Sequence, residues 1–355
     1  MPPTRAVPVP PSLLAVAEQV GRRLDAILSA EQARWRDLSA DLDEPLSALR
    51  TLVMAGGKRL RPAFCHWGYV GAGGDPEAAE LINAGAAFEL LQAFALVHDD
   101  VMDGSATRRG TRTAHLHFAD RHRSESWRGE ARRFGEGVAI LIGDVAHVYA
   151  DLLVAGAPPA ATEIWNELRI ELNVGQYLDI LGTARGDVDH DGARQIARYK
   201  SGKYTIERPL HLGAALAGRL DDLEKPLSAY GDPLGEAFQL RDDILGAFGD
   251  SDAIGKPVGD DLREGKPTPL LALAVAAADG PQARLLQGIG RPELDGDDIA
   301  GLQQVLTDTG ARAGVEEAIE TLTATATEAI ATAPVTDEAR AALVDLAHYV
   351  ANRDA

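Results

Sequence analysis

Two acidic motifs in the chain have residue types and spacing suited to binding divalent cations. The first is DDVMD at 99–103, at the end of a long apolar stretch, and the second lies within FQLRDD at 238–243. On a helix, Asp99 and Asp103 lie one turn apart on the same face and repel each other unless a cation lies between them. Mg²⁺ suits such a pair because it binds few carboxylates and leaves positions for water and substrate phosphate. An exposed acidic helix end is the alternative.

Two basic motifs could bind the anion that such cations would bridge. GGKRLRP at 56–62 has three cations in four residues behind two glycines, which allow a backbone to approach a polyanion closely. It lacks the GxxxxGK[ST] spacing of a P-loop. TRRG at 107–110 begins four residues after Asp103, so its arginines could neutralise the acids or hold a diphosphate through bidentate contacts.

Long helices are needed to position these motifs, and the sequence looks helical from Ser12 onward. Ala, Leu and Glu dominate, and alternating β-branched runs are scarce. We predict a single all-α domain over 12–355, preceded by a Pro-rich flexible tail over 1–11, with an exposed basic loop at 121–133. The strongest apolar helical patterns lie at 81–101, 138–154, 161–181, 196–220 and 233–248.

Composition excludes several classes of protein. The 355 residues are 45% hydrophobic, enough for a large core, and 35 Lys and Arg against 54 Asp and Glu give a net charge of −19, which disfavours nucleic acid as a partner. The single cysteine, Cys65, excludes an intrachain disulfide and fits a reducing cytosol. We expect no signal peptide and no transmembrane helix, because no apolar run reaches about 18 residues.

The chain resembles the trans-isoprenyl diphosphate synthases, the polyprenyl synthetase family. Seven motifs occur in the family's order between about residues 50 and 270. They are GGKRLRP (56–62), DDVMD (99–103), TRRG (107–110), Gly175-Gln176 with Asp179, Lys200-Ser201, FQLRDD (238–243), and Gly255-Lys256-Pro257 through Lys266. The resemblance implies an isoprenoid synthase-type helical bundle around a central cavity, a homodimer and three Mg²⁺ ions per active site. The single cysteine and the lack of a signal peptide lead us to expect a cytoplasmic location.

The resemblance also implies roles for the residues that match the motifs. The implied magnesium ligands are Asp99, Asp103 and Asp242. The implied isopentenyl diphosphate pocket is formed by Lys58, Arg61, Gln92 and Arg109. The implied clamps on the allylic diphosphate are Arg108, Lys200 and Lys256.

Other matched residues have supporting roles in the family. Gln239 is implied to flank the reacting carbons, and Ser201 stands where the family usually has Thr. Lys266 resembles a lysine that closes the site with the C-terminal segment. The implied second-shell or water-mediated partners are Asp100, Gln176 and Asp179.

Product length is implied by the helix that precedes DDVMD. Ala95 and Phe94 lie four and five residues before Asp99, along the path of a growing prenyl tail. An aromatic residue at the fifth position without one at the fourth resembles geranylgeranyl diphosphate synthases, whereas paired aromatics are typical of farnesyl enzymes. We therefore expect a twenty-carbon product, with fifteen carbons as the competitor. An ordinary core role for Phe94 is the alternative.

The implied reaction is Mg²⁺-dependent ionisation, condensation and elimination between isopentenyl diphosphate and dimethylallyl, geranyl or farnesyl diphosphate. A class I terpene cyclase is a rival, but it usually has an Asn/Ser/Glu motif in place of the second acidic pair. A non-catalytic subunit of a heteromeric synthase typically loses the first motif, which is intact here. A phosphohydrolase is a weaker rival, because no strand-loop nucleophile is visible.

One position departs from the family pattern. The second motif is usually DDxxD, but Gly246 stands where the last acid is expected. The first Asp of the motif is implied to carry the metal, so we expect activity to survive. The departure puts the affinity for the third metal in doubt.

Overall fold

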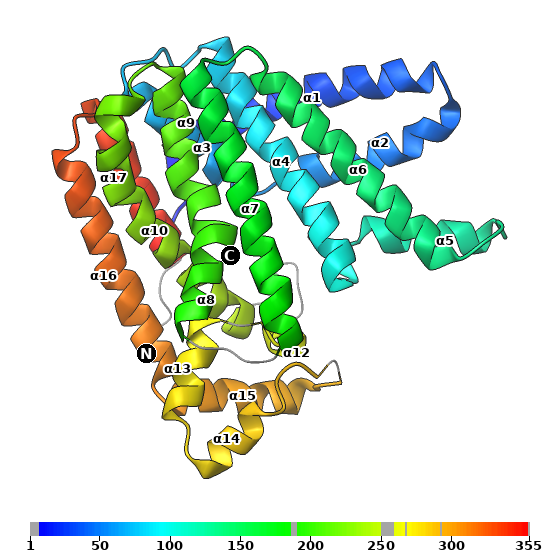
Figure 1. Cartoon of the computed structure of the whole chain (residues 1–355), viewed down its shortest axis with the longest axis vertical. Helices are drawn as coiled ribbons and strands as arrows, with labels where there is room; N and C mark the ends of the chain where they lie inside the picture. Colours follow the sequence, from blue (N-terminus) through cyan, green and yellow to red (C-terminus); the bar gives the residue numbers. More distant parts are fainter. Residues whose placement is uncertain (1–6, 186–189, 250–258, 267, 292, 354–355) are drawn as a thin grey trace. The chain divides into compact units, whose positions relative to one another are not determined.

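The computed structural model describes residues 7–185, 190–249, 259–266, 268–291 and 293–353, and these residues are almost entirely helical (Figure 1). The only strands among them form a two-stranded hairpin. The predicted all-α class is confirmed. The chain separates into two compact units, which we call the N-terminal unit (Pro11–His66 and Asp75–Pro158) and the C-terminal unit (Met1–Pro10, Trp67–Gly74 and Pro159–Ala355). The single domain expected over 12–355 stays a prediction.

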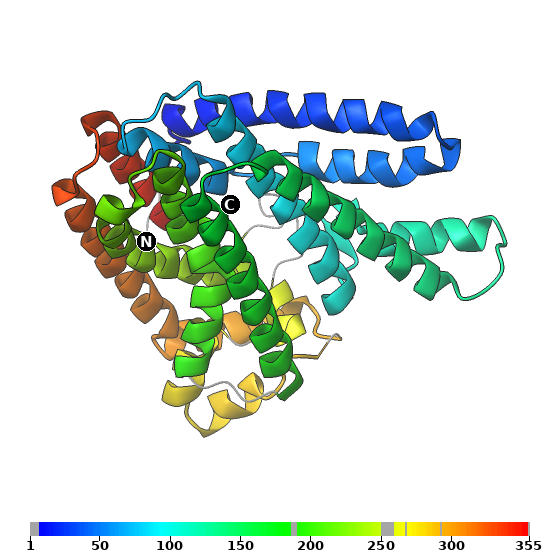
Figure 2. The same cartoon turned by 45° about the horizontal axis from the view of Figure 1, so that its top comes forward.

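The N-terminal unit is built around one buried helix. Its elements are α1 (Pro11–Arg36), η1 (Ala40–Leu42), α2 (Asp43–Met54), the start of α3 (Leu60–Gly71), α4 (Ala79–Asp103), β1 (Thr107–Arg108), β2 (Thr111–Arg112), α5 (Ala114–Ser124) and α6 (Ala131–Val154). Helix α4 packs against α1, α2, α5 and α6. Figure 2 shows α1 and α2 side by side. Because a Cβ at Gly85 would lie 2.8 Å from Val20, only glycine lets α1 pass this close to α4.

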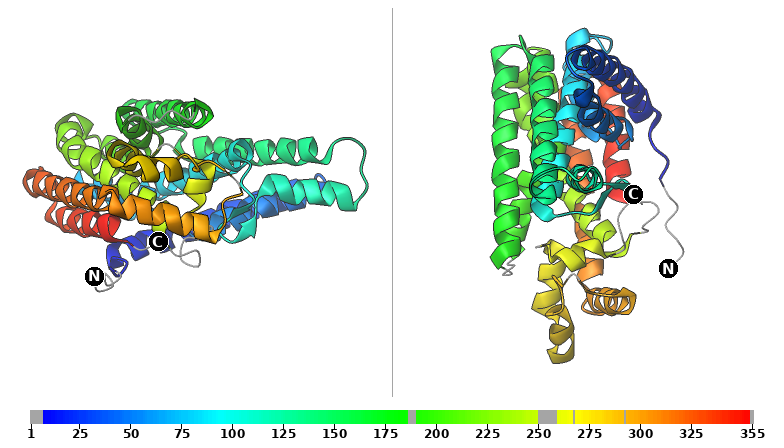
Figure 3. Two further views of the ribbon diagram at one scale, coloured as in Figure 1. Left: turned by 90° about the horizontal axis from the view of Figure 1, so that it is seen from below. Right: turned by 90° about the vertical axis from the view of Figure 1, so that its right-hand side faces the viewer.

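The C-terminal unit is a second helical bundle around α10. Its elements after α3 are α7 (Pro159–Arg185), α8 (His190–Ala197), the π-helix η2 (Arg198–Glu207), α9 (Arg208–Leu216), α10 (Leu220–Phe248), α12 (Asp260–Glu264), α13 (Pro269–Ala277), α14 (Gly280–Leu286), α15 (Gly296–Asp308), α16 (Ala311–Thr332) and α17 (Asp337–Asn352). Helix α10 packs against η2, α9, α16 and α17, and Figure 3 shows α16 and α17 side by side. The buried Tyr230 hydroxyl donates to the Leu343 carbonyl at 2.7 Å, which joins α10 to α17.

Two sequence predictions of local structure are only partly right. The expected basic loop at 121–133 is helical at both ends, since α5 continues to Ser124 and α6 begins at Ala131. The basic residues Arg121 and Arg123 lie in the last turn of α5, where cations are favoured by the helix dipole. The helix expected at 196–220 is divided into η2 and α9, followed by a turn around Gly218.

The apolar helices α4 and α6 are long and apolar enough to cross a membrane by length and composition alone. The expectation of no such helix rested on uninterrupted apolar runs, which polar residues break here. Most of α4 is buried within the protein, as in the core helix of a globular fold. Most of α6 is not, and it leaves a row of apolar side chains exposed.

Candidate active site

The last turn of α4 brings three carboxylates to one helix end. Asp99 and Asp103 are one turn apart, Asp100 is buried, and Gly104 ends the helix in the left-handed conformation at φ +67°. The C-terminus of a helix carries partial negative charge, so acids are unfavourable there without a cation. This geometry fits the predicted divalent-cation site.

The TRRG motif forms a tight β-hairpin that brings an arginine to these acids. Strands β1 and β2 are antiparallel, and Arg109 and Gly110 both have positive φ, as a two-residue type I′ turn requires. The Arg108 guanidinium donates to Asp100 Oδ1 at 2.8 and 2.5 Å and to Asp99 Oδ2 at 3.3 Å. Burial raises the pKa of Asp100 above its usual range, although Arg108 opposes the shift.

The two basic motifs meet on the same unit. Arg109 donates to the Leu52 carbonyl at 3.0 Å. Its guanidinium lies against Gly57, since a Cβ built at that position would be only 3.0 Å from Arg109 Nη2. Burial lowers the pKa of Arg109, and the neighbouring Arg59, Arg108 and Arg61 lower it further. Such a concentration of guanidinium groups favours a bound polyanion.

The cations of GGKRLRP do not all serve the same purpose. Arg59 is buried, pairs with the Glu89 carboxylate and donates to the Val53 carbonyl at 2.7 Å, so it is structural. Its φ of +51° is strained for a non-glycine residue. Lys58 and Arg61 are partly exposed. The implied partner Gln92 has a buried Oε1 with no hydrogen-bond partner among the described residues.

A cavity of about 370 Å³ lies beside this cluster in the N-terminal unit. Its lining includes Asp100, Arg108 and Arg109 together with Ser47, Thr51 and Leu52 of α2. Within the described residues, no three Asp, Glu, His or Cys side chains form a ready-made metal cage. Mg²⁺ does not need one, because it binds through one or two carboxylates, water and substrate phosphates. The oxygen donors of DDVMD therefore fit magnesium.

Of the implied chain-length residues, Phe94 lies on the face of α4 turned toward α6. The Phe94 ring stacks on His147 with centroids 4.7 Å apart and tilts against His98 at 4.6 Å. The His98 ring packs against Gly143, and a Cβ built at Gly143 would lie only 2.3 Å from that ring. His98 Nε2 is 3.0 Å from the Ile140 carbonyl oxygen. His147 was not identified from the sequence, because a lone histidine on a helix carries no motif.

The second acidic motif lies on α10 in the C-terminal unit. Gln239 Nε2 donates to Asp243 Oδ1 at 2.7 Å. Burial raises the pKa of Asp243 far above its usual range, and the neighbouring Asp261 and Asp242 carboxylates raise it further. Asp242 is more exposed than Asp243 and is thus the accessible carboxylate of the pair. This supports the assignment of Asp242, rather than Asp243, as the predicted metal ligand.

Two arginines join the second acidic motif to the C-terminal helices. Arg241 pairs with Glu316 at 2.7 Å and donates to the Ala351 carbonyl at 2.6 Å, so it neutralises neither acid of its own motif. Arg353 donates to Asp242 Oδ1 at 2.5 Å and to the carbonyls of Phe238 and Val350. Sequence reasoning missed Arg353, which lies 111 residues from its partner.

The remaining predicted site residues are placed as follows. Gln176 and the buried Asp179 lie on α7, three residues apart. Lys266 Nζ is 2.7 Å from Glu264 Oε2. Lys200 and Ser201 lie on η2, and Lys256 lies outside the described residues. Asp99, Asp103, Arg108 and Arg109 come together in the N-terminal unit, whereas their convergence with Asp242 on shared ions stays a prediction.

Comparison with known proteins identifies the family. The family model described as polyprenyl synthetase matches residues 44–306. The chain belongs to the polyprenyl synthetase family. Geranylfarnesyl diphosphate synthase from Aeropyrum pernix is 33% identical over 312 residues, which cover 85% of this chain and 92% of that protein. Geranylgeranyl diphosphate synthase from Saccharolobus solfataricus is 33% identical over 264 residues, which cover 72% of this chain and 74% of that protein.

Solved structures of polyprenyl synthetases agree with this assignment. Geranylgeranyl pyrophosphate synthase from Corynebacterium glutamicum, complexed with isoprenyl diphosphate and magnesium, matches with a TM-score of 0.90 and 37% identity over 96% of this chain and 99% of that one. A polyprenyl synthase from Caulobacter crescentus, complexed with calcium and isoprenyl diphosphate, matches with a TM-score of 0.82 and 27% identity. The match covers 99% of this chain and 100% of that one. The predicted family, isoprenoid synthase-type fold and prenyltransferase activity are confirmed.

In this polyprenyl synthetase, the Lys200-Ser201 motif lies on the π-helix η2, and the backbone of η2 contacts the backbone of α10. A Cβ on Gly235 would lie 2.9 Å from Gly202 Cα, so the two glycines are needed for the contact. Ser201 precedes Gly202, and Gln239 lies one turn beyond Gly235. The contact therefore brings the helical segments that carry Ser201 and Gln239 together. π-helical turns are rare and are frequent at functional sites.

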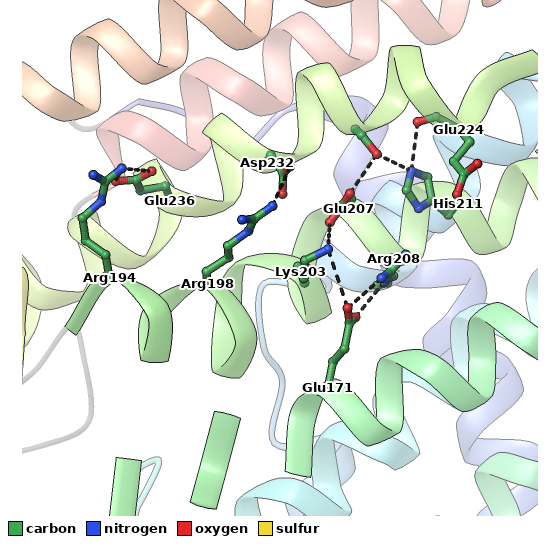
Figure 4. Close-up of polar contacts among 11 residues, drawn as sticks. Glu171, Arg194, Arg198, Lys203, Glu207, Arg208, His211, Glu224, Asp232 and Glu236 are labelled. Carbon is green, nitrogen blue, oxygen red and sulfur yellow. Dashed lines mark hydrogen bonds and ion pairs between the residues drawn. The ribbon is translucent and has the colours of Figure 1, made fainter. Parts of the chain in front are cut away.

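A buried ionic network holds this π-helix in place (Figure 4). Lys203 Nζ lies 2.8 Å from Glu207 Oε2 and 3.6 Å from Glu171 Oε1. Arg208 forms a bidentate pair with Glu171 at 2.6 and 2.7 Å. Ser228 on α10 donates to Glu207 Oε1 at 2.8 Å. Burial acts to raise the pKa of Glu207. Lys203 and Ser228 outweigh this effect and hold that pKa below its usual value.

We predict that Lys203→Met destabilises the protein by about 3 kcal/mol, because it leaves the Glu207 carboxylate buried without its cation. The double variant Lys203→Met/Glu207→Gln should recover most of this loss, since both charges are then absent. Arg198→Gln is the control on the same helix, because its pair with Asp232 is exposed and worth less than about 1 kcal/mol. Urea unfolding measures all three. A Lys203→Met variant as stable as wild type would contradict the network's role.

Proposed function

We propose that the protein is a geranylgeranyl diphosphate synthase, which adds isopentenyl diphosphate to allylic diphosphates up to twenty carbons. The observation that supports this best is the cluster in the N-terminal unit, where three carboxylates at the end of α4 lie beside Arg108 and Arg109. Carboxylates for metal ions next to arginines for phosphate oxygens are what departure of a diphosphate requires.

Three Mg²⁺ ions are proposed, held by Asp99, Asp103 and Asp242. The bound ions would supply Lewis-acid stabilisation of the negative charge that develops on the leaving diphosphate. Arg108 would contribute to the same stabilisation, as would Lys200 and Lys256, which are proposed to clamp the allylic diphosphate. Asp100 keeps Arg108 in place through two hydrogen bonds, so Asp100 is proposed to position this arginine rather than to bind metal.

A separate pocket is proposed for isopentenyl diphosphate. Lys58, Arg61 and Arg109 would hold its phosphates, and Gln92 offers a buried amide that lacks a partner for its oxygen among the described residues. Gln239 is proposed to flank the reacting carbons with Ser201, and Gln176 and Asp179 to act through water. Lys266 is proposed to move with the C-terminal segment and so to help exclude water, which would otherwise capture the allylic cation.

The condensation would proceed from the ionised allylic substrate. The bond between C1 and the bridging oxygen breaks, and the C3–C4 double bond of isopentenyl diphosphate attacks C1 through C4. A proton then leaves C2 of the isopentenyl unit, and the departed diphosphate is the proposed acceptor. The chain's own contribution is to hold both diphosphates and to stabilise negative charge where it appears.

Product length is proposed to depend on Phe94. Its ring stacks on His147 and tilts against His98, so it forms a rigid obstacle on α4 directly before the small Ala95. Farnesyl diphosphate synthase is the second candidate, because such an enzyme from Mycobacterium tuberculosis is 31% identical over 84% of this chain. The absence of an aromatic side chain at Ala95 favours the longer product.

A homodimer in the cytosol is also proposed. On α6, Ile140, Leu141, Val148 and Leu152 are between 44% and 64% exposed, which is unusual for a row of large apolar side chains. A second copy of the chain would cover this row, as the resemblance to a dimeric family implies. The buried, unpaired Cys65 fits a reducing compartment.

Substituting Asp99 tests the proposed activity. With Mg²⁺, isopentenyl diphosphate and each allylic starter, the wild type should form all-trans geranylgeranyl diphosphate. Asp99→Asn should lower turnover on the order of a thousandfold, because metal-ion stabilisation is worth several kcal/mol, while its circular dichroism stays unchanged. Asp222→Asn, an exposed acid elsewhere, is the control. A cyclic hydrocarbon, free phosphate or no product from the wild type would each contradict the proposal.

Phe94→Ala tests the chain-length role. Removing the ring should shift the main product to twenty-five carbons or more, as read by chromatography of the dephosphorylated products. The reciprocal change Ala95→Phe should shorten it to fifteen carbons. If Phe94→Ala leaves the product distribution unchanged, a residue other than Phe94 limits the length of the prenyl tail.

Charges on α6 test the dimer. Leu141→Glu with Leu152→Glu should give a monomer of about half the wild-type mass by light scattering, because two carboxylates would be desolvated at the interface. Leu14→Glu on α1, where the leucine is comparably exposed, should leave the mass unchanged. A monomeric wild type would refute the dimer without affecting the proposed chemistry.

A further inference from the structure

The ionic network around Lys203 joins three long segments of the C-terminal unit (Figure 4). Glu171 extends from α7 and pairs with both Lys203 of η2 and Arg208 at the start of α9. Glu207, the second acid paired with Lys203, accepts a hydrogen bond from Ser228 of α10. The four charged side chains therefore connect η2 to α7 on one side and to α10 on the other.

Two of these segments carry predicted site residues close to the network. On α7, Glu171 and Asp179 are eight residues apart and both buried, so they lie on one face of the helix about two turns apart. On η2, the Lys200-Ser201 motif ends two residues before Lys203. A shift of Lys203 relative to Glu171 would therefore also shift this motif relative to α7.

The register of η2 against α10 shows how far this segment departs from an α-helix. Arg198 pairs with Asp232 at 3.0 Å, and Glu207 accepts a hydrogen bond from Ser228 at 2.8 Å. Between these two contacts the chain advances nine residues along η2 but only four along α10, whereas two antiparallel α-helices advance by equal numbers. The π-helical turns accommodate the surplus. The buried contact at Glu207 thus opposes rewinding of η2 as an α-helix.

A role in stability alone would not require charges at this place. Apolar residues of similar volume can often replace a buried ion pair without loss of stability. Charged pairs differ from apolar contacts because each donor must point at its acceptor. Lys203 Nζ lies between acids of two segments, 2.8 Å from Glu207 Oε2 and 3.6 Å from Glu171 Oε1. These pairs consequently fix the orientation of η2 as well as its contact with α7.

We propose that Lys203 is a positioning residue for the allylic diphosphate site, because its pairs with Glu171 and Glu207 hold the Lys200-Ser201 motif in its π-helical conformation. This rests on the proposed function, in which the motif contacts the allylic substrate. Lys203 is 9% exposed and is already paired with two acids, so it acts through the motif and not on the substrate.

One double variant separates substrate binding from stability. Lys203→Met/Glu207→Gln removes both charges and should recover most of the wild-type stability in urea. Its dissociation constant for farnesyl diphosphate with Mg²⁺, measured by calorimetry, should nevertheless rise on the order of tenfold, about the worth of one hydrogen bond to a charged group. Its affinity for isopentenyl diphosphate should stay unchanged, since that pocket is proposed in the N-terminal unit. A purely structural network would return both affinities to wild type.

Two controls and a second variant accompany this test. Arg198→Gln should leave both affinities unchanged, because its pair with Asp232 on the same helix is exposed. Gly235→Ala moves the η2 segment without removing a charge, since its Cβ would lie 2.9 Å from Gly202 Cα, and it should weaken farnesyl diphosphate binding similarly. Gly301→Ala on α15, where a Cβ meets nothing within 4 Å, is the matched glycine control.

Wild-type affinity for farnesyl diphosphate in the double variant would overturn the inference, as would an equal loss in Arg198→Gln. If the charge variants fold poorly, unchanged affinity in Gly235→Ala would overturn it instead. A wild-type enzyme that binds farnesyl diphosphate but does not extend it would refute the proposed function, and that outcome is distinct from any change of affinity among the variants.

Discussion

The charge balance at the end of α4 is the constraint on which the candidate site depends. Three carboxylates converge on the negative end of a helix, and Arg108 is the nearest guanidinium to two of them. Acids at the negative end of a helix are unfavourable without cations, and divalent ions can supply the positive charge. The same hairpin that delivers Arg108 to the acids turns Arg109 toward the basic loop. A single turn of chain thereby separates groups suited to a metal ion from groups suited to a phosphate.

Strained backbone positions hold these charges apart. Arg59 and Arg109 both have positive φ, a conformation that costs a non-glycine residue on the order of 1 kcal/mol or more. Arg59 is held by its buried pair with Glu89, and Arg109 by its hydrogen bond to the Leu52 carbonyl. Relaxation of either residue would turn a guanidinium away from its present place. At Arg109 the positive φ is the one that its type I′ turn requires, so the hairpin itself places this guanidinium beside Gly57.

The sequence predicted the all-α class, the family and the helix that ends in DDVMD, because helical periodicity and motif order are local signals. Local signals also misplaced some features. The segment 121–133 looked like a loop because it is polar and basic, but cations are favoured at the end of a helix such as α5. Neither Asp261 against Gly246 nor His147 against Phe94 could be inferred, because each contact joins segments whose packing no local pattern records.

The second motif is supported by long-range contacts from the C-terminal end of the chain. The Arg353 side chain is 1% exposed, stacks 4.3 Å from the Phe238 ring and bonds to Asp242, while Arg241 reaches the Ala351 carbonyl. Three of the six residues of FQLRDD thus contact the end of α17 or the residue that follows it. A guanidinium fixes direction as well as charge, since its donors form a rigid planar fork. The orientation of the Asp242 carboxylate is consequently set by the packing of α17 on α10, so the geometry of this candidate metal ligand is a property of the whole bundle.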